Sequence, residues 1–494
     1  MSGAVPPSTR DDLDRAVAAA HRAYEVSQAS SPDVRAGWLE AVAAAMEAHD
    51  TELLHIAAGE SHIPEAQLRR ELARSVFQIR LFCDELVRGE ILDATVDHAD
   101  EGWGMGPRPD LRRVNVPLGV VGVFGASNFP FAFSVMGGDT TSALAAGCGV
   151  VHKVHEAHET LGLRTREVAA EALARAGAPE GLFATVTGRE AGELLVEHPM
   201  VRAVGFTGST RVGRLLFEKA CARAEPIPFY GELGSVNPVF VTPAAWARRR
   251  DEILTGYAQS FTLGMGQFCT KPGLLFVPGS DAADLAAVEQ ALAGVSPTPM
   301  LTPRLADGYG EAVRGASQRP GVSVVVDGGS GDSPRPTLLV TTAEAVRRDP
   351  ELLEREMFGP ASVVVRYESA SELVQVAQLL QGQLTTTLHA EAGEPRDDLV
   401  RVLESRSGRV ILNGWPTGVT VTYAQVHGGP YPATTSAGTT SVGTGALRRF
   451  LRPVAYQGFG DDRLPPPLQE ANPWRIRRRV DGRWVDAPAG EGGS

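Results

Sequence analysis

Cys269 stands among residues that allow the backbone to come close to a ligand. Gly264 and Gly266 precede it, and Pro272 and Gly273 follow it. Because glycine leaves room beside the backbone, a thiol in this stretch can be presented to a substrate. Its thiolate would then be a nucleophile. The other interpretation is a small buried hydrophobic side chain, the usual state of a free cysteine. The stretch alone does not decide between the two.

Two glutamates also lie beside glycine turns. Glu232 ends a strand-like run and is followed by Leu233-Gly234, and Glu356 precedes Phe358 and a Gly-Pro turn. A partly buried Glu232 with a raised pKa would be a general base near neutral pH. A helix cap or an ion-pair partner is the alternative for Glu232, and an ordinary helix end is the alternative for Glu356.

Asn128 follows another apolar run, 118–125, after a Gly-Ala-Ser turn. Its side-chain amide can donate a hydrogen bond to a developing oxyanion, although an Asn in this place is often only a turn residue. Lys153 closes the next apolar run and either reaches cofactor hydroxyls or extends to solvent. Glu156 lies just beyond, where an acid can accept from a ribose 2′-hydroxyl and repel a 2′-phosphate.

Residues 206–213 form a further strand–turn–helix pattern with glycines at the turn. Backbone N–H groups at the start of such a helix can hold a pyrophosphate. The pattern matches neither GxGxxG nor the P-loop, so it is a weak signal by itself.

The elements that position these residues alternate between apolar runs and helical patterns. Residues 11–89 are predicted to be helical, and 92–116 to form a protruding hairpin or arm. Apolar runs at 118–125, 150–154, 182–186, 201–206 and 228–233 are separated by helices, which predicts a doubly wound parallel sheet with its ligand at the carboxyl ends of the strands. The chain after Cys269 repeats this α/β texture.

The fold class is therefore α/β, with a cofactor domain, a second α/β catalytic domain and a small β oligomerisation arm. We assign 1–91 and 117–233 to the cofactor domain, with 441–464 packing on it. The catalytic domain is 234–440, and the arm and tail are 92–116 and 465–494. The tail includes an Asp-Gly turn at Asp481-Gly482, which predicts a β-hairpin.

Composition excludes several classes of protein. The net charge of −12 argues against a nucleic-acid surface. Four widely spaced cysteines, with no CxxC and no zinc-finger spacing, predict a reduced cytoplasmic protein and no metal site. No signal-peptide core and no apolar run of about 18 residues is present, so we expect no membrane segment.

Taken together and in order, these segments resemble the aldehyde dehydrogenase superfamily over roughly residues 10 to 460. The matching pieces are Ser127-Asn128-Phe129-Pro130, Lys153, Phe206-Thr207-Gly208-Ser209, Glu232-Leu233-Gly234, Gly266-Gln267-Phe268-Cys269 and Glu356-Met357-Phe358-Gly359-Pro360. Within it the chain is most similar to the branch of α-ketoglutarate-semialdehyde (2,5-dioxopentanoate) and NADP-linked fatty-aldehyde dehydrogenases. The pieces behind that are 108–112, 124–139, 232–238, 413–419 and 427–435.

The resemblance implies NAD(P)-dependent oxidation of an aldehyde to a carboxylic acid. Cys269 attacks the carbonyl, Asn128 and the Cys269 N–H hold the oxyanion, and Glu232 activates the water that hydrolyses the thioester. His427 tunes the thiol or a water, or is structural. The implied cofactor residues are Phe124, Gly125, Ala126, Ser127, Lys153, Glu156, Gly208, Ser209, Gly213, Glu356 and Phe358.

The resemblance also suggests a substrate. Arg74 lies on a helix that would line the substrate tunnel, where a guanidinium suits an aldehyde with a distal carboxylate such as 2,5-dioxopentanoate. A surface arginine is the alternative. Phe129 and Phe268 would also line the substrate. Glu156 favours NAD over NADP.

Other readings stay open on the sequence. A fatty or biosynthetic aldehyde is an alternative substrate, and a thiol is an alternative acyl acceptor, although Glu232 favours water. An inactive cofactor-binding scaffold is the non-enzyme alternative. The arm and the tail hairpin expose strand edges, which together with the resemblance predicts a homodimer or homotetramer.

Overall fold

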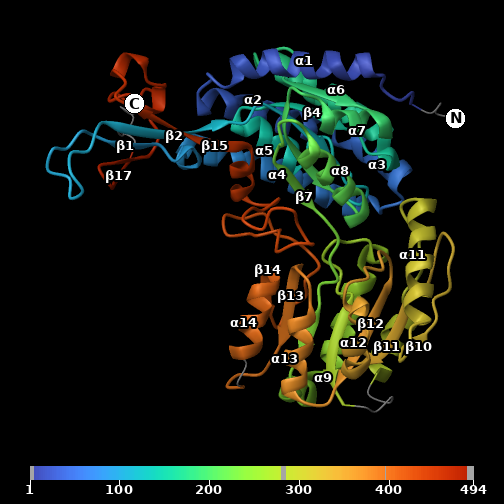
Figure 1. Ribbon diagram of the computed structural model, residues 1–494. Helices are drawn as coiled ribbons and strands as arrows, with labels where there is room; N and C mark the ends of the chain where they lie inside the picture. The colour runs from blue at the N-terminus through green and yellow to red at the C-terminus, as the bar shows by residue number, and fades with distance from the viewer. Residues whose placement is uncertain (1–4, 280–284, 395–396, 487–494) are drawn as a thin grey trace, which may run out of the picture.

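Three β-sheets organise the computed structural model, which describes residues 5–279, 285–394 and 397–486 (Figure 1). Four helices precede the first sheet, and the long apolar stripe of the fourth packs toward the core. They are α1 (Arg10–Ser27), α2 (Pro32–Ala48), α3 (Asp50–Ser61) and α4 (Glu65–Arg88).

The first sheet is fully parallel and has the strand order β5-β4-β3-β6-β7. Its strands are β3 (Val120–Phe124), β4 (Gly149–Lys153), β5 (Phe183–Val186), β6 (Val201–Thr207) and β7 (Phe229–Glu232). The connecting helices are α5 (Gly138–Ala146), α6 (Glu159–Arg175), α7 (Arg189–Glu197) and α8 (Thr210–Ala222). Since the chain order reverses between β3 and β6, the carboxyl ends of these two strands form the expected ligand position.

Helices cover both faces of this sheet because successive strand residues point to opposite sides. Val121 and Val123 pack in one buried cluster with α2, α4, α5 and α6. Val120 and Phe124 pack in another with α1, α7 and α8. The predicted doubly wound α/β architecture is confirmed.

The second sheet has the order β10-β11-β12-β9-β8-β13-β14, and all its pairs are parallel except β10 with β11. Its strands are β8 (Val239–Val241), β9 (Leu274–Pro278), β10 (Ser323–Val326), β11 (Thr337–Thr342), β12 (Ala361–Tyr367), β13 (Gln383–His389) and β14 (Ser407–Leu412). Its helices are α9 (Pro243–Thr262), α10 (Ala286–Ala293), α11 (Pro303–Ser317), α12 (Ala343–Arg348), α13 (Ala370–Leu379) and α14 (Asp397–Arg406). They too fall on both faces.

The third sheet forms the arm, with the order β15-β2-β1-β16-β17. Its strands are β1 (Thr95–Asp97), β2 (Leu111–Pro117), β15 (Leu451–Gln457), β16 (Arg478–Val480) and β17 (Arg483–Val485). The last two form the expected hairpin, with Asp481 and Gly482 both at positive φ. Residues 487–494 of the predicted tail lie outside the described residues.

The stretch 441–464 is divided between two places, whereas the sequence predicted that all of it packs on the cofactor domain. The 3₁₀ segment η6 (Thr444–Phe450) does pack against α5. Strand β15, however, pairs along its whole length with β2 and so belongs to the arm sheet. Its alternating exposure fits an outer strand.

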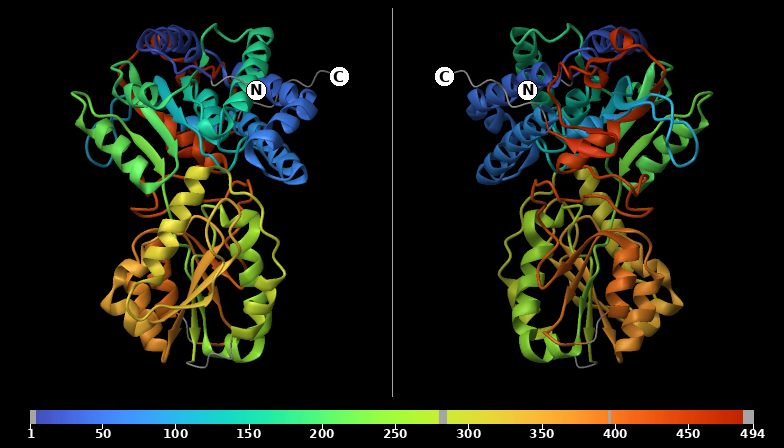
Figure 2. Two further views of the ribbon diagram at one scale, coloured as in Figure 1. Left: turned by 90° about the vertical axis from the view of Figure 1, so that its right-hand side faces the viewer. Right: turned by 90° about the vertical axis from the view of Figure 1, so that its left-hand side faces the viewer.

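Figures 1 and 2 show two bodies and the arm. The first sheet and its helices form the upper body, and the second sheet forms the lower one. The chain passes between them after β7 and again after β14, so residues from both bodies meet at the junction. Among the described helices, none combines the length and apolar character needed to cross a membrane.

Candidate active site

The loop that carries Cys269 lies at the junction, between α9 and β9. Gly264, Met265 and Gly266 all have positive φ, which turns the chain sharply before the cysteine. A Cβ at Gly266 would lie 2.2 Å from the carbonyl oxygen of Gly359, so only glycine fits there. The thiol of Cys269 is partly exposed at the end of this turn.

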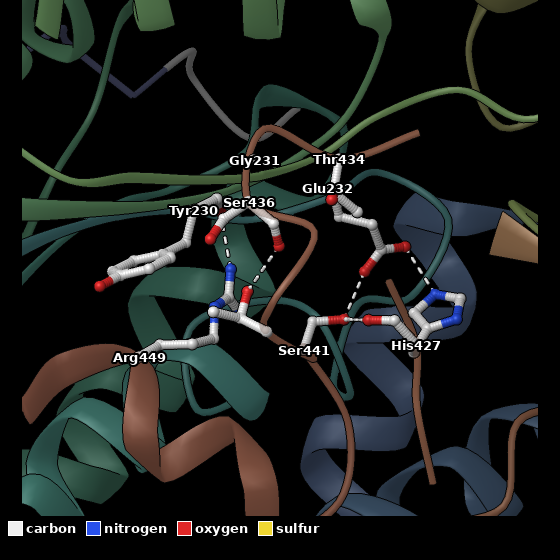
Figure 3. A pocket seen from close by; sticks show the side chains of 9 residues that line it. Tyr230, Gly231, Glu232, His427, Thr434, Ser436, Ser441 and Arg449 are labelled. Carbon is white, nitrogen blue, oxygen red and sulfur yellow. Dashed lines mark hydrogen bonds and ion pairs between the residues drawn. The ribbon is translucent and has the colours of Figure 1, made fainter. Parts of the chain in front are cut away.

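Glu232 and His427 reach the same point from other parts of the chain (Figure 3). Glu232 is the last residue of β7, and His427 comes from the loop after β14. His427 Nε2 lies 3.4 Å from Cys269 Sγ and 2.6 Å from Glu232 Oε1. The three donor atoms all lie within 4.8 Å of one another. The geometry thus brings a nucleophile, a carboxylate and an imidazole together.

The surroundings of these groups make the sulfur a thiol at rest and the carboxylate an anion. Burial raises the pKa of Cys269 well above its ordinary value, and the charges of Glu232 and Glu356 raise it further. Burial also raises the pKa of Glu232, but the charge of His427 and hydrogen bonds from His427 and Ser441 outweigh it, so that this pKa is lowered. An ionised base therefore lies beside a protonated nucleophile.

Asn128 approaches the nucleophile loop from the turn after β3. Its Nδ2 donates a hydrogen bond to the carbonyl oxygen of Gln267, at 2.9 Å. One N–H is used there, and an amide nitrogen carries two. The amide therefore has a second N–H, and its hydrogen bond holds it at the residue two positions before Cys269.

An aromatic cluster and an arginine border the same loop. Phe129 contacts Phe133 and Phe268, with ring centroids 5.5 and 5.3 Å apart. The ring centroids of Phe133 and His427 are 6.0 Å apart, and the Arg74 guanidinium carbon lies 5.6 Å from the Phe133 centroid. Apolar walls with a few polar groups are typical of small-molecule sites.

Arg74 is half-buried rather than a surface residue. Its Nε donates to the carbonyl oxygen of Val419 at 3.3 Å, and its Nη1 is buried without a hydrogen-bond partner among the described residues. Burial lowers the pKa of Arg74, while the charges of Glu71 and Glu232 oppose this shift. A guanidinium with a spare donor thus faces the reaction centre.

Hydrogen bonds from a buried lysine join the nucleophile loop to the segment that carries Glu356. Lys271 is 2% exposed, and its Nζ donates to the carbonyl oxygens of Met357 and Ala361 at 2.8 and 2.6 Å. Burial lowers the pKa of Lys271 to about 8 and raises that of Glu356 to about 7, and the attraction between their charges opposes both shifts. This contact fixes where Glu356 and Phe358 lie relative to Cys269.

The predicted cofactor residues gather at the carboxyl ends of the first sheet. Phe124 ends β3 and Gly125, Ala126 and Ser127 follow it, Lys153 ends β4, and Glu156 begins the turn after β4. Gly208 and Ser209 follow β6, and Ser209 Oγ caps α8 by accepting from Val212 N. Gly213 lies one turn into α8, where a Cβ would meet Leu233 at 2.2 Å. A helix start, hydroxyl partners and close backbone fit a dinucleotide.

A small polar cavity borders Glu232 and His427 (Figure 3). Its volume is about 10 Å³, which is roughly the space that one water molecule needs. It is lined by Tyr230, Gly231, Glu232, His427, Thr434, Ser436, Thr439, Ser441 and Arg449. Ser441 Oγ donates to Glu232 Oε2 at 2.5 Å and so holds the carboxylate in place.

Sequence reasoning missed three residues that build this site. They are Ser441, Lys271 and Asn237, whose Nδ2 donates to the carbonyl oxygens of Cys269 and Lys271 at 2.7 and 3.0 Å. Asn237 and Lys271 lie close in sequence to Glu232 and Cys269, and this proximity indicated that they could belong to the site. Ser441 lies in a loop of small residues, and no sequence pattern pointed to it.

Comparisons with known proteins agree with this geometry. Residues 1–431 match the model of the aldehyde dehydrogenase family. Alpha-ketoglutaric semialdehyde dehydrogenase 2 of Azospirillum brasilense is 45% identical over 488 residues, covering 96% of this chain and 91% of the relative. The alpha-ketoglutaric semialdehyde dehydrogenase of Acinetobacter baylyi is 39% identical over 486 residues, covering 96% and 92%.

Solved structures share the fold. Gamma-glutamyl-gamma-aminobutyraldehyde dehydrogenase from Burkholderia cenocepacia superposes with a TM-score of 0.78 at 23% identity, covering 92% of this chain and 90% of that one. The family model spans most of the chain, and both semialdehyde dehydrogenases align over nearly its full length. The chain therefore belongs to the aldehyde dehydrogenase family and is an NAD(P)-dependent aldehyde dehydrogenase.

Proposed function

We propose that this enzyme oxidises an acidic semialdehyde such as 2,5-dioxopentanoate to the dicarboxylic acid, with Cys269 as nucleophile. The observation that carries the proposal is the meeting of Cys269, Glu232 and His427 beside the aromatic cluster and Arg74. The two relatives with 45% and 39% identity bear the name of this activity.

The first step needs a base, because burial keeps the Cys269 sulfur protonated. Ionised Glu232 takes the thiol proton as sulfur bonds to the aldehyde carbon, and the carbonyl oxygen becomes an oxyanion. The free N–H of Asn128 and the backbone N–H of Cys269 stabilise that charge. One preorganised donor of this kind contributes about 3–4 kcal/mol.

When bound, NAD(P) would supply the oxidant, a hydride acceptor for the carbon attached to Cys269. Lys153, Glu156 and Glu356 would hold its riboses, Ser209 its pyrophosphate, and Phe358 the nicotinamide end. Gly208, Gly213 and the residues at the end of β3, Phe124 to Ser127, would let the cofactor approach the backbone. Glu232 first releases the thiol proton to solvent and then takes a proton from the water that cleaves the thioester; the Cys269 sulfur departs as a thiolate and is reprotonated, and the acid leaves.

The experiment is a steady-state assay over an aldehyde panel, with free acid and thioester products separated by mass spectrometry. We expect 2,5-dioxopentanoate to give a higher kcat/KM than fatty or neutral aldehydes of matched length, and free acid as product. Cys269→Ser should abolish the NADH burst. A preference for fatty aldehydes would contradict the proposed substrate. A thioester formed with an added thiol would contradict hydrolysis by water.

Arg74 is proposed to bind the distal carboxylate. Arg74→Met should raise KM for the acidic semialdehyde at least about tenfold, since a charged hydrogen bond contributes about 1.5–3 kcal/mol. KM for a neutral aldehyde should stay within about twofold, and Arg74→Lys should be intermediate. Equal changes for both aldehydes would remove this role.

We propose NAD as the preferred cofactor, on the position of Glu156 after β4. Arg304 of α11 lies 3.7 Å from Glu156 and partly neutralises it, so the preference should be modest. Glu156→Gln should raise the kcat/KM for NADP relative to the kcat/KM for NAD. A clear NADP preference of the wild type would show that Glu156 does not face the 2′ position.

We further propose a cytoplasmic homodimer or homotetramer. Four free thiols in the described residues suit a reducing compartment. The open edges of the arm sheet and of β14 suit pairing with another copy.

A further inference from the structure

Cys269, His427 and Glu232 form a set of donors that also has the chemistry of a metal site. The set contains one sulfur, one imidazole nitrogen and one carboxylate oxygen, all within 4.8 Å of one another. These are the donor types that bind Zn²⁺ in proteins, and three protein ligands with one open position are usual where a water or substrate completes the site. Among the described residues no other group of three such donors meets.

One of the donor distances already suits a tetrahedral zinc ion, and a second needs a small movement. Zn–S lengths of about 2.3 Å and Zn–N or Zn–O lengths of about 2.0–2.2 Å separate neighbouring donors by roughly 3.3–3.6 Å. Cys269 Sγ and His427 Nε2 are already 3.4 Å apart. His427 Nε2 and Glu232 Oε1, at 2.6 Å, must separate by under about 1 Å.

The metal would displace a contact between two of its own ligands. Ser441 holds Glu232 by Oε2, and Oε1 lies 2.6 Å from His427 Nε2, so a metal would take the place of the proton between these two atoms. His427 Nδ1 has no hydrogen-bond partner among the described residues. When a metal displaces the proton from Nε2, the imidazole can carry its proton on Nδ1, which leaves the Nε2 lone pair for the metal.

The charges also balance. A thiolate and a carboxylate together carry two negative charges, which a divalent cation neutralises, so the neighbouring Arg74 guanidinium meets no net positive charge. Sulfur and nitrogen donors favour Zn²⁺ over Mg²⁺ or Ca²⁺, which need oxygen ligands. The site therefore discriminates by donor type rather than by charge.

We propose that Zn²⁺ binds reversibly to Cys269, His427 and Glu232 and thereby inhibits the enzyme in competition with the aldehyde. The metal replaces the thiol proton, which is released to solvent, and a water fills the fourth position on the side that the aldehyde carbonyl would take. No electron is transferred. The ion is an inhibitor and not a cofactor of the reaction. The inference holds whichever aldehyde is oxidised.

The test uses the full-length enzyme without cofactor or aldehyde. Zn²⁺ binding is measured by competition with a chromophoric chelator, and Co²⁺ is added separately to detect the absorption band of a thiolate–cobalt bond. We expect one Zn²⁺ per chain and a thiolate–cobalt band. Inhibition should be reversed by EDTA and overcome by aldehyde, and Mg²⁺ should have no effect.

Variants assign the ligands. Cys269→Ala should abolish the cobalt band, and His427→Gln and Glu232→Gln should each weaken Zn²⁺ binding at least about tenfold. Cys221→Ser removes an exposed thiol on α8 and is the matched control, expected to bind as the wild type does. Circular dichroism checks that each variant is folded. Unchanged Zn²⁺ affinity in Cys269→Ala or His427→Gln would overturn the proposal, as would non-competitive inhibition.

Failure of this proposal is distinct from failure of the proposed function. If the wild-type enzyme binds Zn²⁺ at this site but prefers a fatty aldehyde, the metal site is supported and the proposed substrate is wrong. If it prefers the acidic semialdehyde but binds no Zn²⁺, the proposed substrate is supported and the metal site is wrong.

Discussion

At the scale of single residues, the reaction depends on which group holds the proton before attack. Burial and two carboxylates make the thiolate of Cys269 costly, whereas His427 and Ser441 keep Glu232 ionised. Glu232 is therefore expected to act twice, first on the thiol and then on the water.

We predict that Glu232→Gln lowers kcat by roughly 10²–10⁴, the usual contribution of a general base. The glutamine keeps the size of the side chain and an oxygen for the Ser441 hydrogen bond, so folding should be preserved. Steady-state kinetics with the preferred aldehyde measure the effect. Ser441→Ala removes only the hydrogen bond that orients Glu232, so it should lower kcat less than about tenfold. If Ser441→Ala lowered kcat as much as Glu232→Gln does, orientation of the carboxylate rather than its action as a base would limit the rate.

At the scale of elements, the site depends on buried charged side chains that form hydrogen bonds between separate segments. Lys271 joins the nucleophile loop to the segment before β12, and Glu71 of α4 joins that helix to the turn before α5. Each contact crosses between elements that are far apart in the chain. Two predictions follow from the charges.

Lys271→Met removes two hydrogen bonds from a charged donor and the positive charge that favours ionised Glu356. A hydrogen bond to a charged group contributes about 1.5–3 kcal/mol, so the free energy of unfolding should fall by a few kcal/mol in urea titrations. Adding Glu356→Gln removes the stranded charge and should recover part of the loss. A double variant no more stable than Lys271→Met alone would show that the two charges do not interact.

Glu71 should make the protein less stable as the pH rises. Burial raises its pKa to about 7 from an ordinary 4.5, although N–H groups of Phe131 and Ala132 lower it in part. Between about 4.5 and about 7 the folded state therefore holds more protons than the unfolded state, and stability falls as pH increases.

The matched comparison is Glu71→Gln, which keeps the acceptor for both N–H groups. Each pKa unit corresponds to about 1.4 kcal/mol, so the variant should gain a few kcal/mol on the wild type as the pH passes through this window. Thermal unfolding at a series of pH values measures it. Parallel pH profiles of Tm for the two proteins would contradict the expectation.

At the scale of the whole molecule, two sheets end in open strands with apolar side chains. Leu412 on β14 is 54% exposed, and Trp484 on β17 is 45% exposed. Neither strand has a partner on its outer side among the described residues. Such edges are suited to pairing between copies.

We expect Leu412→Lys to shift the protein toward smaller assemblies, because a charge on an edge strand opposes pairing. The dissociation constant of the oligomer should rise at least about tenfold, which corresponds to about 1.4 kcal/mol. Light scattering during size-exclusion chromatography, over a range of concentrations, measures it. Leu215→Lys on α8, where the leucine is 46% exposed, is the control and should leave the assembly unchanged.

The sequence by itself determined the α/β class, the order of strands and helices in the first sheet, and the residues that could do chemistry. Runs such as 118–125 are apolar throughout because both faces of a covered parallel strand are buried, and this property is local. The glycines around Cys269 and the carboxylate ending β7 were likewise visible, since backbone turns and acidic groups need no partner to be recognised.

Only the tertiary structure decided which side chains meet. Ser441 holds Glu232 across 209 residues, Arg74 reaches Val419 across 345, and β15 leaves the upper body to join the arm. Lys271 donates hydrogen bonds to carbonyl oxygens of another loop. These contacts depend on how loops run between packed sheets, and local residue chemistry does not specify that course. The pKa values of Cys269 and Glu232 depend on it as well, because burial and neighbouring charges exist only once the two bodies have come together.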